Sequence, residues 1–472
     1  MIKTSSMAKS GLDLKPFILM ILLALVAVAL NTVSFTAPQI ISTLVFMGIL
    51  FGTLFYWKFR LTFAFGGLFV LLAAHLIDID HIVQFAGLDV ILFLVGMMIL
   101  IGYMEEKHFF EYLIAKVDDA IGHRPYLLVS TLMFLSALFS ALVGEVTAIL
   151  FMLSTTFHLT KRYKVNPVPF LLMLVFAANI GSSSTAVGNP IGVMIALRAH
   201  FTVTDFLRWA APMSLVALAL TIGMCLVMFR KTIHELAERM KAERKEVSEA
   251  VHVAHKKEDI RRCWALFIGT IALLIFHAEL EHILGLEKNT LLIGISLAAG
   301  AVGILLMADD APDFFTRRVD WWTLTFFMAL FASVGTLKYV GVTERIADGM
   351  ILLGHGDSNI LLIAFTSAIS LLTGFMDNVL AVATFIPILG EIGKAGVYIF
   401  PFWWAMLFGG TMYGNLTVVG STANIVAMGM LEKEYQKHIT FFEWLGPGFL
   451  VSTVTVVSAV VLLMMQFPLM PR

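Results

Sequence analysis

The chain has 472 residues, of which 59% are hydrophobic and only 14% are charged, and its mean hydropathy is +0.90. This number of charged side chains is too small to cover the surface of a soluble globule of this size. The composition therefore indicates an integral membrane protein surrounded by membrane lipid. We expect it in the inner or plasma membrane. The net charge of −1 provides no basic surface, which argues against a nucleic-acid partner.

Apolar runs of about 17 to 25 residues can cross the roughly 30 Å hydrocarbon core of a bilayer. The chain contains about eleven such runs and is therefore predicted to be an all-α, polytopic membrane protein. The first run follows a polar segment and lacks a small-residue cleavage site, so we interpret it as a membrane helix rather than a signal peptide. The predicted spans are 16–35, 39–57, 61–77, 88–104, 168–199, 209–229, 264–284, 290–307, 321–340, 401–430 and 446–466.

Two further apolar stretches are interrupted by polar residues near their middle. Gly144-Glu145 interrupts 125–160, and Asp377-Asn378 interrupts 358–390. We predict that each stretch is a re-entrant helical hairpin. A polar tip at that depth is tolerated only where protein or a water-filled cavity surrounds it.

The distribution of lysine and arginine predicts the orientation. The segment Arg230–Arg262 contains ten Lys/Arg and seven Asp/Glu. Because cytoplasmic loops carry an excess of positive residues, we expect this segment and the N-terminus inside and the C-terminus outside.

The two halves of the chain resemble each other at an offset of about 233 residues. Val146 and Ala148 recur as Val379 and Ala381, and Thr185 recurs as Thr417. An odd number of crossings separates the copies, which predicts two inverted-topology repeats that form one site between them. The predicted organisation is N-terminal scaffold helices at 1–87, repeat 1 at 88–229, a cytoplasmic linker at 230–263, connecting and scaffold helices at 264–320, and repeat 2 at 321–472.

Glu145 and Asp377 are carboxylates in otherwise apolar sequence. A charge at that depth costs about 2.5 to 3.5 kcal/mol on insertion scales, so each carboxylate calls for a partner, and a cation or a proton is the simplest one. The alternative is that each carboxylate only caps a hairpin helix. We predict that Asp377 is the coupling carboxylate and that Glu145 is a second titrating group.

Two predicted spans, 168–199 and 401–430, are broken by clusters of Gly, Ser, Thr and Asn. Unwound backbone exposes carbonyl oxygens that suit sodium, and the half-helix after each break directs its positive end inward, which suits an oxyacid. Close helix packing by small residues is the alternative. The predicted ion- or substrate-binding residues are Asp377, Asn378, Glu145, Thr147, Asn179, Ser182, Ser183, Ser184, Thr185, Asn189, Asn415, Thr417, Ser421, Thr422 and Asn424. A sodium ion is predicted at Asp377, Asn378, Asn179 and Asn415, and no other cofactor is expected.

These motifs resemble those of the ion transporter superfamily, which includes arsenite permeases, NhaD-type sodium/proton antiporters, silicon efflux transporters, the pigmentation P protein and dicarboxylate/sodium symporters. Asn179 to Pro190 is similar to the first broken helix of the arsenite and silicon efflux branch, and Met376-Asp377-Asn378-Val379 to the NhaD-type hairpin tip. Gly414 to Asn424 is similar to the second broken helix. Gly144-Glu145 departs from the Asn-Asp or Asp-Asn that relatives carry. The resemblance implies a homodimer and an elevator-like transport domain.

No Walker motif, GxSxG or HExxH occurs in the sequence, which argues against ATP-driven pumping and against an enzyme. We therefore predict a secondary transporter of a small inorganic ion or oxyacid, coupled to protons or sodium. Sodium/proton antiport is favoured by the two carboxylates, and arsenite-type efflux by the serines of the first break. A sodium-coupled di- or tricarboxylate transporter and a channel without coupled transport are the alternatives.

Overall fold

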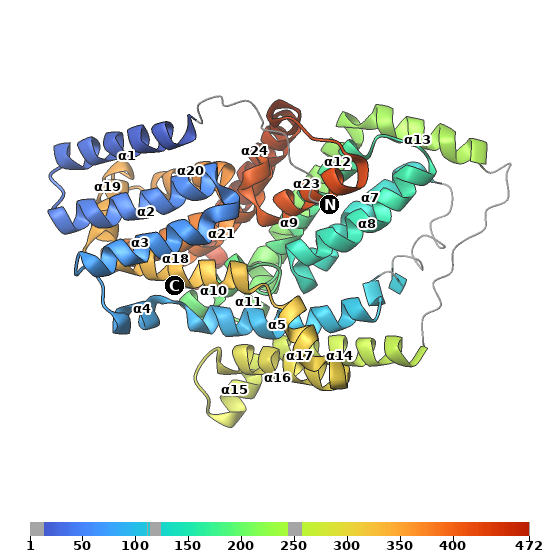
Figure 1. The fold of residues 1–472 in the computed structure, drawn as a ribbon, viewed down its shortest axis with the longest axis horizontal. Coiled ribbons are helices and arrows are strands. Elements are labelled where there is room, and N and C mark those ends of the chain that lie inside the picture. Colours follow the sequence, from blue (N-terminus) through green and yellow to red (C-terminus); the bar gives the residue numbers. More distant parts are fainter. Residues whose placement is uncertain (1–13, 111, 114–123, 244–256, 472) are drawn as a thin grey trace, which may run out of the picture. The chain divides into compact units, whose positions relative to one another are not determined.

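The computed structural model describes residues 14–110, 112–113, 124–243 and 257–471 (Figure 1). Every regular element in these residues is a helix, and none is a strand. The predicted all-α class is therefore confirmed. Part of the predicted linker, residues 244–256, lies outside the described ranges.

The chain divides into two compact units. The first consists of Met1–Gly87 and Trp322–Arg345. It contains the helices α1 Lys15–Thr32, α2 Ala37–Phe55, η1 Trp57–Phe59, α3 Arg60–Ala73 and α4 Ile79–Phe85, most of α18 Trp321–Tyr339 and the beginning of α19 Val342–Leu353. Arg60 is buried in this unit, donates a hydrogen bond to Thr323 Oγ1 at 2.6 Å and lies over the ring of Trp57.

The second unit consists of Leu88–Trp321 and Ile346–Arg472. Its first part contains α5 Leu88–Glu106, α7 Pro125–Val143, α8 Glu145–Arg162, α9 Pro167–Ser182, α10 Pro190–Ala199, α11 Val203–Asp205, the π-helix η2 Phe206–Ala210, α12 Ala211–Met228, α13 Arg230–Glu243, α14 Lys257–Ile275, α15 His277–Leu284, α16 Thr290–Met307, η3 Ala308–Asp310 and α17 Ala311–Arg318. Its second part contains α20 Ser358–Phe375, α21 Asn378–Lys394, α22 Phe400–Met412, η4 Tyr413–Asn415, η5 Val418–Gly420, α23 Thr422–Tyr435, α24 Phe441–Gln466 and η6 Phe467–Leu469.

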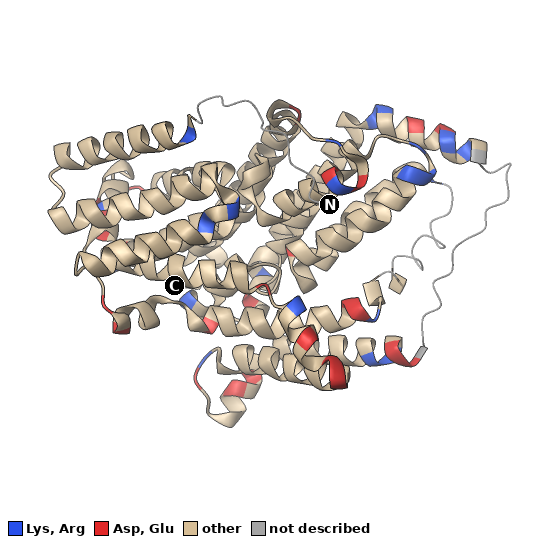
Figure 2. Ribbon diagram, viewed as in Figure 1, with Lys and Arg blue, Asp and Glu red and all other residues tan. Residues whose placement is uncertain are grey.

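The described helices include eight that are long and apolar enough to cross a membrane, or up to ten if each bent pair is one span. Figure 2 shows that charged residues lie mostly at helix ends and in connecting segments, as in a bilayer-spanning protein. The eight include α7 and α20, which were predicted as arms of the hairpins, and the predicted span 61–77 contains only the 14-residue α3. The predicted number of about eleven is also not reached because the two broken spans consist of shorter helices. These are α9 and α10 in the first and α22 and α23 in the second.

Both predicted hairpins are helix pairs that turn at the predicted residues. α7 ends and α8 begins at Gly144, and α7 packs against α8. Gly144 has φ +96°, which a residue with a side chain rarely adopts, so the turn between α7 and α8 favours glycine. α20 and α21 meet at Met376-Asp377, where Asp377 Oδ1 accepts a hydrogen bond from the amide of Val379 and caps α21.

α9 approaches α7 so closely at Gly181 that an added Cβ would overlap backbone atoms of Ala137. We therefore expect Gly181→Ala to separate the two helices and to lower the free energy of unfolding by about 1 to 3 kcal/mol. Thermal unfolding of the purified variant in detergent measures this effect.

Gly223→Ala is the matched control, because Gly223 lies in α12 and an added Cβ there has no neighbour within 4 Å. Helix propensity alone predicts a stability equal to wild type or up to about 1 kcal/mol higher. Equal melting temperatures of the two variants would contradict the close approach at Gly181.

Candidate functional site

Four short segments of the second unit meet around Glu145. Two are the hairpin tips, Gly144-Glu145 (tip 1) and Met376–Asn378 (tip 2). The other two are the breaks between α-helices, residues 183–189 between α9 and α10 (break 1) and residues 413–421 between α22 and α23 (break 2), which includes the short 3-10 helices η4 and η5. All four lie in the interior of the unit, so the polar groups that they carry are withdrawn from solvent.

Glu145 lies at the centre of the site. Its side chain is 3% exposed, and its carboxylate accepts hydrogen bonds from Ser182 Oγ at 3.1 Å, Ser421 Oγ at 3.2 Å and Asn378 Nδ2 at 3.4 Å. Its backbone amide donates to the carbonyl oxygen of Gly188 at 3.1 Å. Glu145 of tip 1 thus contacts α9, both breaks and tip 2.

Asn179, at the end of α9, joins the two halves of the chain. Its Nδ2 donates to Asn415 Oδ1 at 2.7 Å and to Asn424 Oδ1 at 2.8 Å, and its Oδ1 accepts from Ser421 Oγ at 3.1 Å. Asn424 in turn donates to the carbonyl oxygens of Gly414 and Thr417, both at 2.8 Å, and so fixes break 2. We call the connected side chains the carboxylate cluster: Glu145, Asn179, Ser182, Asn189, Asn378, Asn415, Ser421 and Asn424.

Asp377 lies beside this cluster with different partners. It is 2% exposed, Oδ1 accepts from the amide of Val379 at 3.1 Å, and Oδ2 accepts from Thr422 Oγ1 at 2.7 Å. Asp377 therefore connects tip 2 to the start of α23. Its carboxylate also serves as a helix cap, as one of the alternatives from the sequence suggests.

Thr185 and Thr417 make matching hydrogen bonds in the two halves. Thr185 donates to the carbonyl oxygen of Ala141 in the first hairpin, and Thr417 donates to that of Gly374 in the second, at 2.7 Å. Positions 141 and 374 differ by 233, the offset between the predicted repeats. Each break is thus held against the end of its own hairpin by a threonine.

Besides Asp377, Thr185, Thr417 and Thr422, three more of the predicted residues lie outside the cluster. Ser183 bonds Ser214 of α12 and the carbonyl oxygen of Ile180, and Ser184 bonds that of Gly181. Thr147 is half-buried on α8. Asn189 is joined to the cluster, because its Nδ2 donates to Ser182 Oγ at 2.7 Å while its Oδ1 caps α10.

The structure identifies two buried hydroxyls that were not among the predicted site residues. Ser140 and Thr373 are fully buried one turn before the two tips, and neither Oγ of Ser140 nor Oγ1 of Thr373 has a hydrogen-bond partner among the described residues. They are 233 positions apart, so the offset between the repeats could have identified them from the sequence. A buried hydroxyl without a partner is uncommon and is suited to binding an additional group.

The cluster contains negative charge but no fixed positive charge. Among the described residues of the second unit no Lys or Arg is buried, and the one buried arginine, Arg60, belongs to the first unit. Arg198, at the end of α10, forms an ion pair with Asp89 on α5 at 2.5 Å. An ionised Glu145 is therefore stabilised only by neutral donors, and a bound proton or cation would stabilise it further.

Two curated relatives are similar to the chain over most of its length. The chain is 30% identical over 384 residues to an uncharacterized transporter of Mycobacterium tuberculosis, covering 80% of this chain and 86% of that protein. It is 25% identical over 447 residues to the human P protein, covering 79% of this chain and 52% of that protein.

The fold is also similar to a solved structure, the YdaH transporter of Alcanivorax borkumensis. The TM-score is 0.58 at 18% identity, and the likeness covers 86% of this chain and 90% of that one. The family profile described as citrate transporter (CitMHS) matches residues 53–409 and 341–471. The resemblance to the ion transporter superfamily is thereby confirmed, and the protein belongs to the citrate transporter family of membrane transporters.

Proposed function

We propose that the protein is a secondary transporter that exchanges sodium or lithium ions for protons at the carboxylate cluster. The main support for this proposal is the environment of Glu145. Its side chain is buried among neutral donors from both halves of the chain and has no Lys, Arg or His partner among the described residues. A proton and a metal cation each neutralise such a carboxylate, so they compete for it. That competition is the physical basis of exchange.

The chemistry of the surrounding atoms favours a hard cation. The cluster offers carboxylate, amide and hydroxyl oxygens, to which we add the hydroxyls of Ser140 and Thr373. Among the described residues no group of three or more His, Cys, Asp or Glu could hold a metal, which argues against a transition-metal ion as cargo. Asp377, Asn378, Asn179 and Asn415 remain the proposed sodium ligands, and we propose that Glu145 joins them when it is deprotonated.

The geometry supports Glu145 rather than Asp377 as the group that exchanges the proton. Asp377 uses one oxygen to cap α21 and the other to accept from Thr422. Glu145 accepts from α9, break 2 and tip 2, so a change in its charge affects all of these segments. Asp377 is retained in the proposal as the second carboxylate.

Arsenite-type or silicate-type efflux is supported less well. In the sequence, this function was supported by the run of serines Ser182-Ser183-Ser184 at the first break. In the structure only Ser182 bonds to the cluster, because Ser183 and Ser184 donate to backbone carbonyls of α9.

Citrate is the second candidate cargo, because the family profile that matches the chain is described as citrate transporter. A citrate anion carries up to three negative charges, and the described residues of the second unit bury no Lys or Arg to meet them. We propose that citrate, if carried, binds together with cations held beside Glu145.

Proteoliposomes containing the purified protein and a pH-sensitive dye test the proposal. Gradients of sodium, lithium, arsenite, silicate and citrate are applied one at a time. We expect protons to move with the sodium or lithium gradient and not with arsenite or silicate. Proton movement with citrate alone would favour the second candidate, and no movement with any gradient would support a channel without coupling.

An elevator-like movement and a homodimer are further parts of this proposal, and they rest on the family resemblance. Light scattering of the detergent-purified protein measures the mass of the assembly. A mass of one chain, after subtraction of detergent, would contradict the dimer without affecting the exchange reaction.

A further inference from the structure

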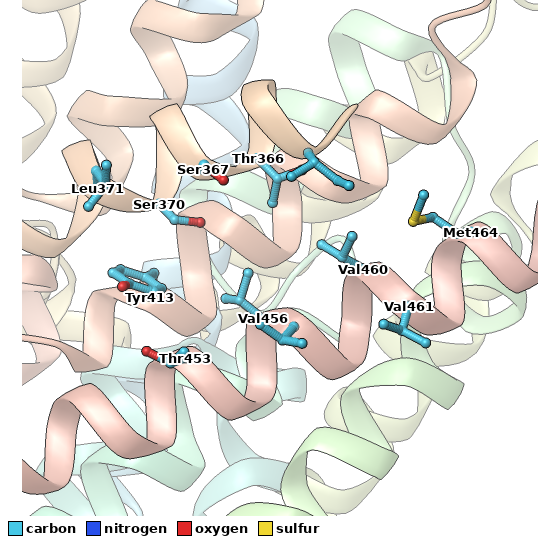
Figure 3. Close-up of a pocket in the computed structure, with 12 residues that line it drawn as sticks. Thr366, Ser367, Ser370, Leu371, Tyr413, Thr453, Val456, Val460, Val461 and Met464 are labelled. Carbon is cyan, nitrogen blue, oxygen red and sulfur yellow. The ribbon is translucent and has the colours of Figure 1, made fainter. Parts of the chain in front are cut away.

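A groove lies between α20 and α24 in the second unit, outside the carboxylate cluster (Figure 3). It encloses about 470 Å³, within the roughly 300 to 1,000 Å³ of ligand-binding pockets. α20 is the first arm of the second hairpin, and Tyr413 of break 2 lies at one end of the groove. None of its lining residues is charged.

Two hydroxyls in the groove lack partners. Ser370 is 3% exposed, and neither its Oγ nor Oγ1 of Thr453 has a hydrogen-bond partner among the described residues. The nearby Thr366 differs, because it donates to the carbonyl oxygen of Leu362 at 2.7 Å. Helical Ser and Thr often satisfy their hydroxyls in this way, so the two hydroxyls of Ser370 and Thr453 are available to a ligand with an acceptor oxygen.

The groove is polar at one end and apolar at the other. Figure 3 shows Ser370, Tyr413 and Thr453 near one end, and Val460 and Met464 toward the other. The ligand that matches this arrangement has one uncharged polar group and a hydrocarbon chain. A charged head group would have no counter-charge among the lining residues.

The rim of the groove is formed by apolar side chains that are about half exposed, including Leu371 and Val457. Both walls are membrane-spanning by length and composition, so the ligand enters from the lipid phase. Ser370 is twelve residues after Ser358, the start of α20, which places it about 18 Å along the helix.

We propose that this groove binds an uncharged single-chain amphiphile from the bilayer, such as a long-chain alcohol. Its oxygen accepts hydrogen bonds from Ser370 and Thr453, and its chain lies along the valines of α24 toward Met464. The site is separate from the ion-binding residues, so its test does not depend on the proposed transport reaction.

Photolabelling of the full-length protein in proteoliposomes tests the proposal. One probe is an aliphatic alcohol that carries a diazirine, and the other is phosphatidylcholine with a diazirine on one acyl chain. Labelled peptides are identified by mass spectrometry. We expect the alcohol to label α20 and α24 saturably, with competition by unlabelled decanol, and the phospholipid to label without saturation.

Variants of the hydroxyl residues measure their contribution. Ser370→Ala and Thr453→Val should each raise the half-saturating alcohol concentration by roughly fivefold, as expected for one lost hydrogen bond. Val456→Phe should abolish saturable labelling by filling the groove. Thr455→Val is the matched control, because its hydroxyl donates to the carbonyl oxygen of Val451 and it does not line the groove.

Wild-type half-saturation in both hydroxyl variants would overturn the proposal, even if Val456→Phe did not fold. Saturable labelling by the phospholipid instead of the alcohol would also overturn it, because the occupant would then be a lipid tail.

Discussion

Replacing Glu145 by glutamine is expected to reduce cation-driven proton movement to the level of protein-free vesicles. Glutamine has nearly the same shape, and its Nε2 can donate to Ser182, whose own hydroxyl then donates to the carbonyl oxygen of Asn179 at 2.9 Å. Its Oε1 can still accept from Ser421 and Asn378. The variant therefore removes the charge and the titration while it keeps the hydrogen bonds, and the pH-sensitive dye in proteoliposomes reports the loss.

Two other carboxylates serve as comparisons. Asp377→Asn should keep its helix cap, but it removes the charge of a proposed sodium ligand, so we expect it to weaken coupled transport without abolishing it. Glu281→Gln changes a buried carboxylate outside the cluster, which accepts from the amides of Asn289 and Leu291 at 3.0 and 2.8 Å. Glu281→Gln shows whether the loss of a buried carboxylate lowers transport only by destabilising the fold, and we expect this variant to retain transport. Coupling that survives in Glu145→Gln and disappears in Asp377→Asn would reassign the proton to Asp377, as the sequence suggested.

Replacing Asn179 by leucine is expected to give the largest loss of stability at the site. The change leaves Oδ1 of Asn415, Oδ1 of Asn424 and the hydroxyl of Ser421 without their bonds to Asn179 in a buried region. Each buried polar group that loses its partner costs about 1 to 3 kcal/mol, and rebonding within the cluster recovers part of this. We expect a total of roughly 3 to 6 kcal/mol and a variant that is recovered poorly from the membrane.

Ser183→Ala is the control for this prediction. Ser183 is four residues further along the same helix end, but it bonds Ser214, which keeps its bond to the carbonyl oxygen of Ala210 at 3.0 Å. We expect a cost of at most about 1 kcal/mol and unchanged transport. Thermal unfolding in detergent compares the two variants. A similar loss in both would mean that Asn179 does not hold the halves together through its side chain.

The sequence alone determined the positions at which the membrane helices are interrupted. Polar residues in apolar runs are costly in a bilayer, so Gly144-Glu145, Asp377-Asn378 and the two Ser/Thr/Asn clusters stood out, and the structure ends helices at each of them. The internal repeat also paired Thr185 with Thr417, and the structure shows that the two make matching hydrogen bonds.

Only the tertiary structure decided which polar side chains share a site. Adjacent residues at a helix end point in directions about 100° apart, so Ser182 faces Glu145 whereas Ser183 faces α12. In and beside the breaks the direction of each side chain depends on contacts with segments more than 200 positions away, as with Asn179 and Asn415. For the same reason the central place of Glu145 and the groove beside α24 could not be read from spacing.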